Sequence, residues 1–196
     1  MTIDADMNEP IEREISPTKV DLNSERATLL LDIASEDIDV SELAELAVKY
    51  GYEQKDEYHV TLLGFAKGRE IKAFLNSLDQ EERARMGQEI ENLVNQIEWK
   101  IKILPDQHLI SREKAVEYPY GSKQMVDEYR SSIVQMVEIA GAEDFYTKLS
   151  ELTGLQFDPP PTHITIFAKS SIPAYMKAGI GIDSAEQFAA MNQGKL

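Results

Sequence analysis

Residues 59–62 read His-Val-Thr-Leu and residues 163–166 read His-Ile-Thr-Ile, so nearly the same tetrapeptide occurs twice in one chain. Each copy is followed by Phe-Ala-Lys, at 65–67 and at 167–169. Threonine and β-branched aliphatic residues favour strands, and the segments 58–65 and 162–168 are therefore predicted as strands. Because side chains alternate between the two faces of a strand, each segment would present His and Thr on one face and its aliphatic residues on the other.

Two such strands lying side by side would direct two imidazoles and two hydroxyls into a shared cleft. An imidazole with the ordinary pKa of about 6.5 exists in both forms near neutral pH, so one histidine can accept a proton while the other donates one. Threonine hydroxyls can donate to the non-bridging oxygens of a phosphate. The pattern predicts His59 and His163 as general base and general acid, in either order, and Thr61 and Thr165 as phosphate-binding residues. No metal and no other cofactor is required.

The paired His-x-Thr-x motifs resemble those of the 2H phosphoesterase superfamily, which includes proteins similar to 2′-5′ RNA ligases and cyclic phosphodiesterases. The run Pro159-Pro160-Pro161 before the second motif and the Gly-Ile-Gly-Ile stretch at 179–182 fit the same context. The resemblance implies an α+β fold with two pseudo-symmetric lobes, each with an antiparallel sheet flanked by helices, around a central cleft. It also implies metal-independent hydrolysis of 2′,3′-cyclic phosphates, ADP-ribose cyclic phosphate, or 2′-5′ linked and cyclic oligonucleotides. The subfamily stays open, and so does the choice between RNA-end processing and removal of a nucleotide signal.

Length and charge restrict the organisation and the partners. A chain of 196 residues suits one domain. We expect a single bilobal domain over 21–196 after a disordered acidic tail over 1–20 that can serve as a protein-binding segment. The net charge is −15, from 35 acidic and 20 basic residues. This balance argues against binding of long nucleic acid, which needs a basic face. A small nucleotide or short oligonucleotide stays compatible, because salt screens charges beyond about 8 Å.

The sequence favours a cytoplasmic protein without a membrane partner. The uncharged apolar runs, such as 27–31, are far shorter than a membrane span. Residues 1–6 lack the apolar segment of a secretory signal. The chain has no cysteine, which excludes disulfides, thiolate catalysis and metal sites built on cysteine.

Apolar spacing and capping residues predict the other elements. Strands are expected at 27–34, 97–104, 108–111 and 115–120, with a turn at Pro105-Asp106. Helices are expected after the capping boxes of Asp39 with Glu42 and Asp79 with Glu82, and at 69–77, 80–95, 143–152 and from Ser184. A long helix is expected from Ser122 to Gly141, because Met125, Val126, Tyr129, Ile133, Met136 and Val137 form one apolar stripe. Interleaved strands and helices indicate an α+β domain.

Four further residues are candidates for substrate binding. Lys67 and Lys169 would emerge on the histidine face if the motif strands continue straight, and would offset phosphate charge there; ordinary solvated lysines are the simpler interpretation. Tyr118 and Tyr120 precede the predicted helix at Ser122 and could stack on a base, although aromatic residues that cover a core would have the same pattern. His108 lacks a threonine two positions later and is interpreted as a surface or strand-edge residue.

Three alternatives compete with the phosphoesterase hypothesis. The same cleft could hold a nucleotide without turnover, as a sensor or adaptor does. The two motifs could be a coincidence in an acidic interaction protein. Two histidines could also bind a metal, but zinc would want a third ligand at close spacing, and none of the usual histidine spacings occurs. Neither a phosphate-binding Gly-x-x-x-x-Gly-Lys loop nor a dinucleotide fingerprint is present.

Overall fold

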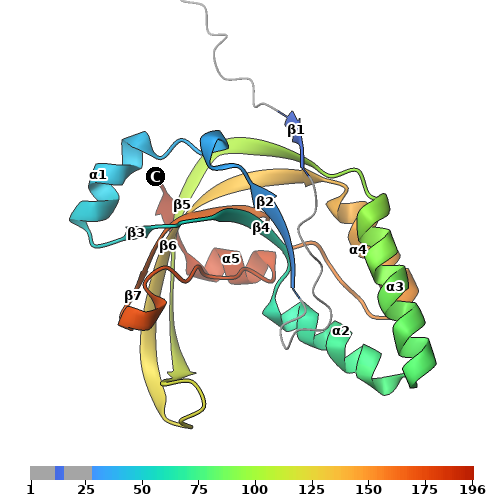
Figure 1. The fold of residues 1–196 in the computed structure, drawn as a ribbon. Helices are drawn as coiled ribbons and strands as arrows, with labels where there is room; N and C mark the ends of the chain where they lie inside the picture. Colours follow the sequence, from blue (N-terminus) through green and yellow to red (C-terminus); the bar gives the residue numbers. More distant parts are fainter. Residues whose placement is uncertain (1–11, 16–27) are drawn as a thin grey trace, which may run out of the picture.

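The computed structural model describes residues 12–15 and 28–196, which form an α+β fold around one antiparallel sheet (Figure 1). The sheet has eight strands, with the path β1-β5-β6-β7-β4-β2, while β3 pairs with β7 and β8 pairs with β5. The strands are β1 (Glu12–Glu14), β2 (Leu29–Ile33), β3 (Glu53–Gln54), β4 (Tyr58–Leu63), β5 (Lys100–Glu117), β6 (Met125–Ala140), β7 (His163–Ser170) and β8 (Asn192–Lys195). The α+β class predicted from the sequence is therefore confirmed.

Two apolar clusters lie on the sheet. The helices are α1 (Ser41–Lys49), α2 (Phe65–Ser77), α3 (Gln80–Gln96), α4 (Ala142–Thr153) and α5 (Ala185–Met191), with short 3₁₀ turns at Ser35–Asp37 and Pro173–Tyr175. The main core joins buried residues of α2, α3 and α4 to the strands, with Ile71, Ile90 and Phe145 as examples. A second, smaller cluster joins α5 and the segment before it to β5 and β6 through Ile110, Val134, Ile180, Ile182 and Met191.

Sheet pairing differs from the expectation of a separate sheet in each lobe. All eight strands belong to one sheet, and β4 joins β7 at the antiparallel pair Val60–Ile164. This pair lies in the middle of the two repeated tetrapeptides, so the sheet brings the motifs side by side.

The long hairpin of β5 and β6 corrects the prediction of a helix from Ser122 to Gly141. Residues 125–140 form β6, which pairs with β5 from Lys100–Ala140 to Glu117–Met125 (Figure 1). The segment 131–135 is buried on both faces of the sheet, so its apolar residues do not alternate as they would in a half-exposed strand. Their spacing is therefore also compatible with a helix, although Ile133, Val134 and Val137 are β-branched and favour a strand.

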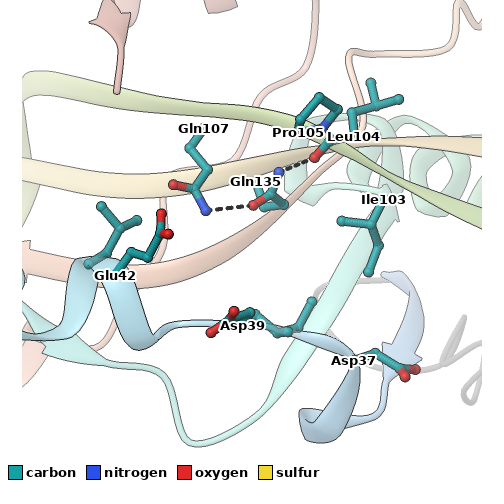
Figure 2. A pocket seen from close by; sticks show the side chains of 10 residues that line it. Asp37, Asp39, Glu42, Ile103, Leu104, Pro105, Gln107 and Gln135 are labelled. Carbon is teal, nitrogen blue, oxygen red and sulfur yellow. Dashed lines mark hydrogen bonds between the residues drawn. The ribbon is translucent and has the colours of Figure 1, made fainter. Parts of the chain in front are cut away.

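The turn predicted at Pro105-Asp106 is instead an irregularity inside β5. The register with β6 shifts between Ile103 and Gln107, and the strand continues beyond it. The Gln135 side chain bridges the irregularity, since its amide donates to the carbonyls of Leu104 and Asp106 and accepts from Gln107 Nε2 at 2.8 Å. Figure 2 shows the hydrogen bonds with Leu104 and Gln107. Proline is tolerated within a strand at such a site because no ladder hydrogen bond needs its nitrogen.

Several other predictions are confirmed, some with shifted ends. The strand expected at 27–34 is β2, and the helices expected at 80–95, at 143–152 and from Ser184 are α3, α4 and α5. Asp79 and Ser184 cap their helices by accepting from the backbone amides of Glu82 and Gln187. The helix expected at 69–77 begins at Phe65, because the strand ends at Leu63 and Gly64 precedes the first turn. Asp39 accepts from Ser41 rather than closing a capping box with Glu42.

Most of the acidic tail predicted over 1–20 lies outside the described residues. Residues 12–14 differ from that prediction, because they form β1 and pair with Lys100–Lys102 of β5. Backbone pairing of this kind does not depend on an apolar pattern, which is why the sequence of the tail gave no sign of it.

Candidate functional site

The two motif strands place four polar side chains around one small cavity. Antiparallel pairing at Val60–Ile164 puts His59 across from Thr165 and Thr61 across from His163. The side chains of Val60 and Ile164 are fully buried in the main core. His59, Thr61, His163 and Thr165 line a cavity of about 150 Å³, together with the segment Gly179-Ile180-Gly181. The structure thus brings all four predicted catalytic side chains together.

The register of each motif strand shifts directly after its threonine. In β4, Thr61 pairs with Leu30 and Leu63 with Leu29, so Leu62 is skipped. In β7, Thr165 pairs with Val134 and Phe167 with Ile133, so Ile166 is skipped. An extra residue in a strand turns the following side chains to the opposite face. The sequence repeat is therefore accompanied by a repeat of the same backbone irregularity.

Neither lysine lines the cavity, because β4 ends at Leu63 before Lys67 and the register shift in β7 turns Lys169 to the opposite face. The straight continuation assumed for Lys67 and Lys169 does not occur. Lys67 lies in α2, where its ammonium donates to the Asp158 carbonyl and stands 4.8 Å from the Tyr146 ring centre. Burial lowers the pKa of Lys67, against the attraction of nearby carboxylates. Lys169 donates to the Tyr50 carbonyl at 2.7 Å, in an apolar groove separate from the histidines.

The predicted tyrosines lie near the turn of the β5–β6 hairpin, at the bottom of Figure 1. Tyr120 is 80% exposed, and Tyr118 packs edge-on against Tyr175 with ring centres 5.7 Å apart. Neither is among the residues that line the histidine cavity. His108 is also elsewhere, with Nδ1 3.2 Å from Asn192 Oδ1 and its ring against Phe188.

His163 is a buried histidine whose ring nitrogens face backbone carbonyls. Its Nε2 lies 3.3 Å from the Ile180 oxygen, and its Nδ1 lies 3.5 Å from the Pro161 oxygen. Because a carbonyl oxygen can only accept, His163 is the donor in either contact. Burial lowers the pKa of His163, the two carbonyls act in the opposite direction, and nearby His59 lowers the pKa further.

His59 has a different environment, since its ring is only partly buried. It stands opposite Asp32 in the β2–β4 register. Burial is the main cause that lowers the pKa of His59, and the Lys55 ammonium lowers it as well, while Asp32 and Glu57 raise it. Both histidines are therefore neutral at pH values where an exposed imidazole already takes up a proton.

Sequence reasoning missed the residues that cover this cavity. Gly179 approaches Thr165 so closely that a Cβ atom on it would lie 2.8 Å from the threonine Oγ1. Arg130 of β6 donates to the Gly179 carbonyl at 3.0 Å and pairs with buried Glu128. The two glycines at 179 and 181 could have indicated this close approach from the sequence, whereas Glu128 and Arg130 lie in a segment predicted as a helix.

Four further cavities in the described part of the chain have no histidine in their lining. The cavity in Figure 2 has a volume of about 460 Å³ and is lined by acidic residues of the α1 region and by part of β5. Within residues 12–15 and 28–196, no three His, Cys, Asp or Glu side chains are grouped so that they could hold a metal ion. None of the helices in this described part is both long and apolar enough to cross a membrane.

Comparisons with known proteins found no match: no family model and no curated protein matches the sequence, and no solved structure matches the fold. The geometry of the cavity and the resemblance of the two motifs are therefore the basis for assigning a function.

The buried His163 is expected to make stability fall as the solution is acidified. Its pKa is lowered in the folded chain, so the unfolded chain takes up a proton first once the pH falls below the ordinary value of about 6.5. The stability is fully present above that value and is lost toward the lower folded pKa, by at most about 1.4 kcal/mol per pH unit. Urea unfolding from about pH 7.5 to about pH 5.5 should show a smaller loss for His163→Gln than for wild type; equal losses would contradict this expectation.

Proposed function

We propose that this chain is a metal-independent phosphoesterase that hydrolyses a cyclic or 2′-linked nucleotide phosphodiester. His59 and His163 move the protons, and Thr61 and Thr165 hold the phosphate. The observation that carries the proposal is the meeting of both His-x-Thr pairs at one cavity through adjacent strands. If the two motifs were a coincidence, there would be no reason for both His-x-Thr pairs to line the same cavity.

The size of the cavity supports a phosphate as the group that is held there. Pockets for drug-sized ligands measure about 300–1,000 Å³, and the histidine cavity measures about 150 Å³. It suits one phosphoryl group, so the nucleoside would lie outside it. The net charge of −15 favours a substrate with few phosphates over a long polyanion.

The two histidine environments support different roles. Carbonyl oxygens lie at both ring nitrogens of His163 and accept from both N–H groups when the ring is protonated, so we assign the protonated form of His163 as the general acid. His59 is assigned as the general base. It accepts a proton from a water molecule while the water oxygen bonds to phosphorus. The bond from phosphorus to the leaving sugar oxygen then breaks, and protonated His163 gives that oxygen a proton and becomes neutral. Exchange with solvent restores both histidines.

The proposal also includes a division of the fold into two pseudo-symmetric lobes. We regard β4 and β7 as the equivalent strands of two pseudo-symmetric lobes, with the cavity as part of the cleft between them. The register shifts after Thr61 and after Thr165 support this equivalence, since each follows its motif at the same position.

Phosphorus NMR in the presence of EDTA tests the proposed activity. The wild-type protein is mixed with 2′,3′-cyclic nucleotides, ADP-ribose cyclic phosphate, and short 2′-5′ and cyclic oligonucleotides. We expect the resonance of at least one substrate to be replaced by that of a phosphomonoester. Resonances that shift or broaden without conversion would instead favour a nucleotide-binding sensor that lacks turnover.

Two glycines that line the cavity give a matched pair of variants. In Gly179→Ala the new Cβ would lie 2.8 Å from Thr165 Oγ1, whereas in Gly181→Ala it meets no atom within 4 Å. Threonine is stiff at χ1, so Gly179→Ala should displace its hydroxyl and lower the hydrolysis rate about tenfold or more. Gly181→Ala should stay within about threefold of wild type. Equal rates for the two variants would contradict a role of Thr165 in holding the phosphate.

A further inference from the structure

The segment Gly179-Ile180-Gly181 touches both residues of the second motif. The Ile180 carbonyl faces His163 Nε2 at 3.3 Å, and Gly179 lies against Thr165. Residues 178–183 form neither helix nor strand, so side-chain contacts decide where the segment lies.

Two kinds of contact hold this segment over the sheet. Ile180 and Ile182 are buried in the second apolar cluster with Val134 of β6. Apolar contacts are not directional, so they keep the segment down without fixing where its carbonyls point. The hydrogen bond from Arg130 Nη1 to the Gly179 oxygen, at 3.0 Å, is a directional contact from a neighbouring strand of the sheet.

Arg130 is itself fixed by a buried carboxylate. Its Nη2 and Nε lie 2.6 and 2.8 Å from Glu128 Oε1, and the two side chains are 11% and 0% exposed. Ser170 of β7 also donates to Glu128 Oε1, at 2.7 Å. A buried ion pair is often no more stabilising than apolar residues of similar volume, so stability alone gives little reason for this pair.

We propose that Arg130, oriented by Glu128, is a positioning residue that fixes the Ile180 carbonyl against His163 Nε2 through its hydrogen bond to Gly179. The planar guanidinium suits this task because one edge binds the carboxylate while another N–H reaches the segment. The carbonyl then keeps the proton of neutral His163 on Nε2, and it accepts from the same N–H in the protonated form that acts in the proposed reaction. In this sense the inference rests on the proposed function.

The proton on His163 Nε2 provides a readout that needs no substrate. We expect ¹⁵N-edited NMR above about pH 7, where the lowered pKa keeps His163 neutral, to detect an imidazole proton on Nε2 in the wild type. In Arg130→Gln its exchange with water should be about five- to tenfold faster, the change expected when one hydrogen bond is lost. The exchange rate in Arg130→Lys should lie between those of the wild type and Arg130→Gln, because an ammonium lacks the planar fork that binds both Glu128 and the Gly179 carbonyl.

A double variant keeps the test decisive if Arg130→Gln leaves Glu128 unpaired and fails to fold. Glu128→Gln with Arg130→Met removes both charges together, retains an acceptor for Ser170, and breaks the link to Gly179. Arg112→Gln is the matched control, because Arg112 stands directly across from Arg130 in the sheet and lines no part of the histidine cavity. It should leave the exchange rate within about twofold of wild type.

The outcomes separate this inference from the proposed activity. Faster exchange in the Arg130 variants but not in Arg112→Gln supports the positioning role. Unchanged exchange in a folded Arg130 variant, or equal acceleration in Arg112→Gln, overturns it. If the Arg130 variants behave as expected while the wild type converts no phosphodiester, the phosphoesterase proposal fails and the positioning of His163 stands.

Discussion

Replacement of either cavity histidine by alanine is expected to lower the hydrolysis of a cyclic nucleotide by about 10²- to 10⁴-fold, the usual contribution of one proton-transfer group. His59 and His163 line the same cavity from adjacent strands, and each is paired with a threonine. Because the two histidines act in one proton relay, the double variant should be little worse than the poorer single variant. Phosphorus NMR in EDTA measures all three rates on one substrate.

His108→Ala is the matched control for these variants, since it removes the remaining histidine of the chain. His108 lies in β5 and contacts Asn192 and Phe188 rather than the cavity. Its removal should leave the rate within about threefold of wild type. A folded His59→Ala or His163→Ala protein with wild-type turnover would refute the proposed mechanism.

Gly141→Ala is expected to cause the largest loss of stability among simple glycine substitutions. Gly141 joins β6 to α4 with φ of +87°, a conformation that costs an L-residue about 1–2 kcal/mol. A Cβ atom there would lie 2.5 Å from Ile97 Cγ2 and 3.1 Å from the Glu98 carbonyl oxygen. Overpacking of this kind costs about 1–3 kcal/mol, so the free energy of unfolding should fall by about 2–5 kcal/mol, measured by urea unfolding.

Substitutions of two other glycines distinguish the cost of the positive φ from the cost of the contact with Ile97. Gly154 also has a positive φ, +69°, but an added Cβ there meets no atom within 4 Å, so Gly154→Ala should cost about 1–2 kcal/mol from conformation alone. Gly87 lies inside α3 and is equally uncrowded. Gly87→Ala should increase the stability by about 0.5–1 kcal/mol through helix propensity. A loss in Gly141→Ala no greater than that in Gly154→Ala would show that the contact with Ile97 is relieved without cost.

The sequence was informative where local chemistry and spacing agree with the fold. The two His-x-Thr strands, the capped helices α3 and α5, and the α+β class follow from alternation, capping residues and turn residues. It failed where long-range pairing decides the structure. The stripe of apolar residues in β6 fits a helix as well as a strand buried on both faces, and the contact with β5 resolves the ambiguity.

In the candidate site, too, local sequence patterns predicted some residues, whereas long-range contacts decided others. The repeat identified His59, Thr61, His163 and Thr165 as one group, and the structure places them at one cavity. The position of Lys67 depends on the end of β4 at Leu63 and the start of α2 at Phe65. The position of Lys169 depends on a register shift that no residue pattern predicts, because a strand with an extra residue has the same composition as one without it. The contact of Arg130 with Gly179 joins residues far apart in the chain and was equally invisible.

The outer edge of β5 has a consequence for association between molecules. An unpaired strand edge is a template for pairing with another chain. Along β5, the short strands β1 and β8 cover residues 100–102 and 108–110. Pro105 interrupts the stretch between them, and Arg112, Glu113 and Lys114 bring alternating charge to the part beyond. By pairing with residues 108–110, β8 thus covers a part of this edge that would otherwise be open to a strand from another molecule, which is separate from the chemistry of the histidine cavity.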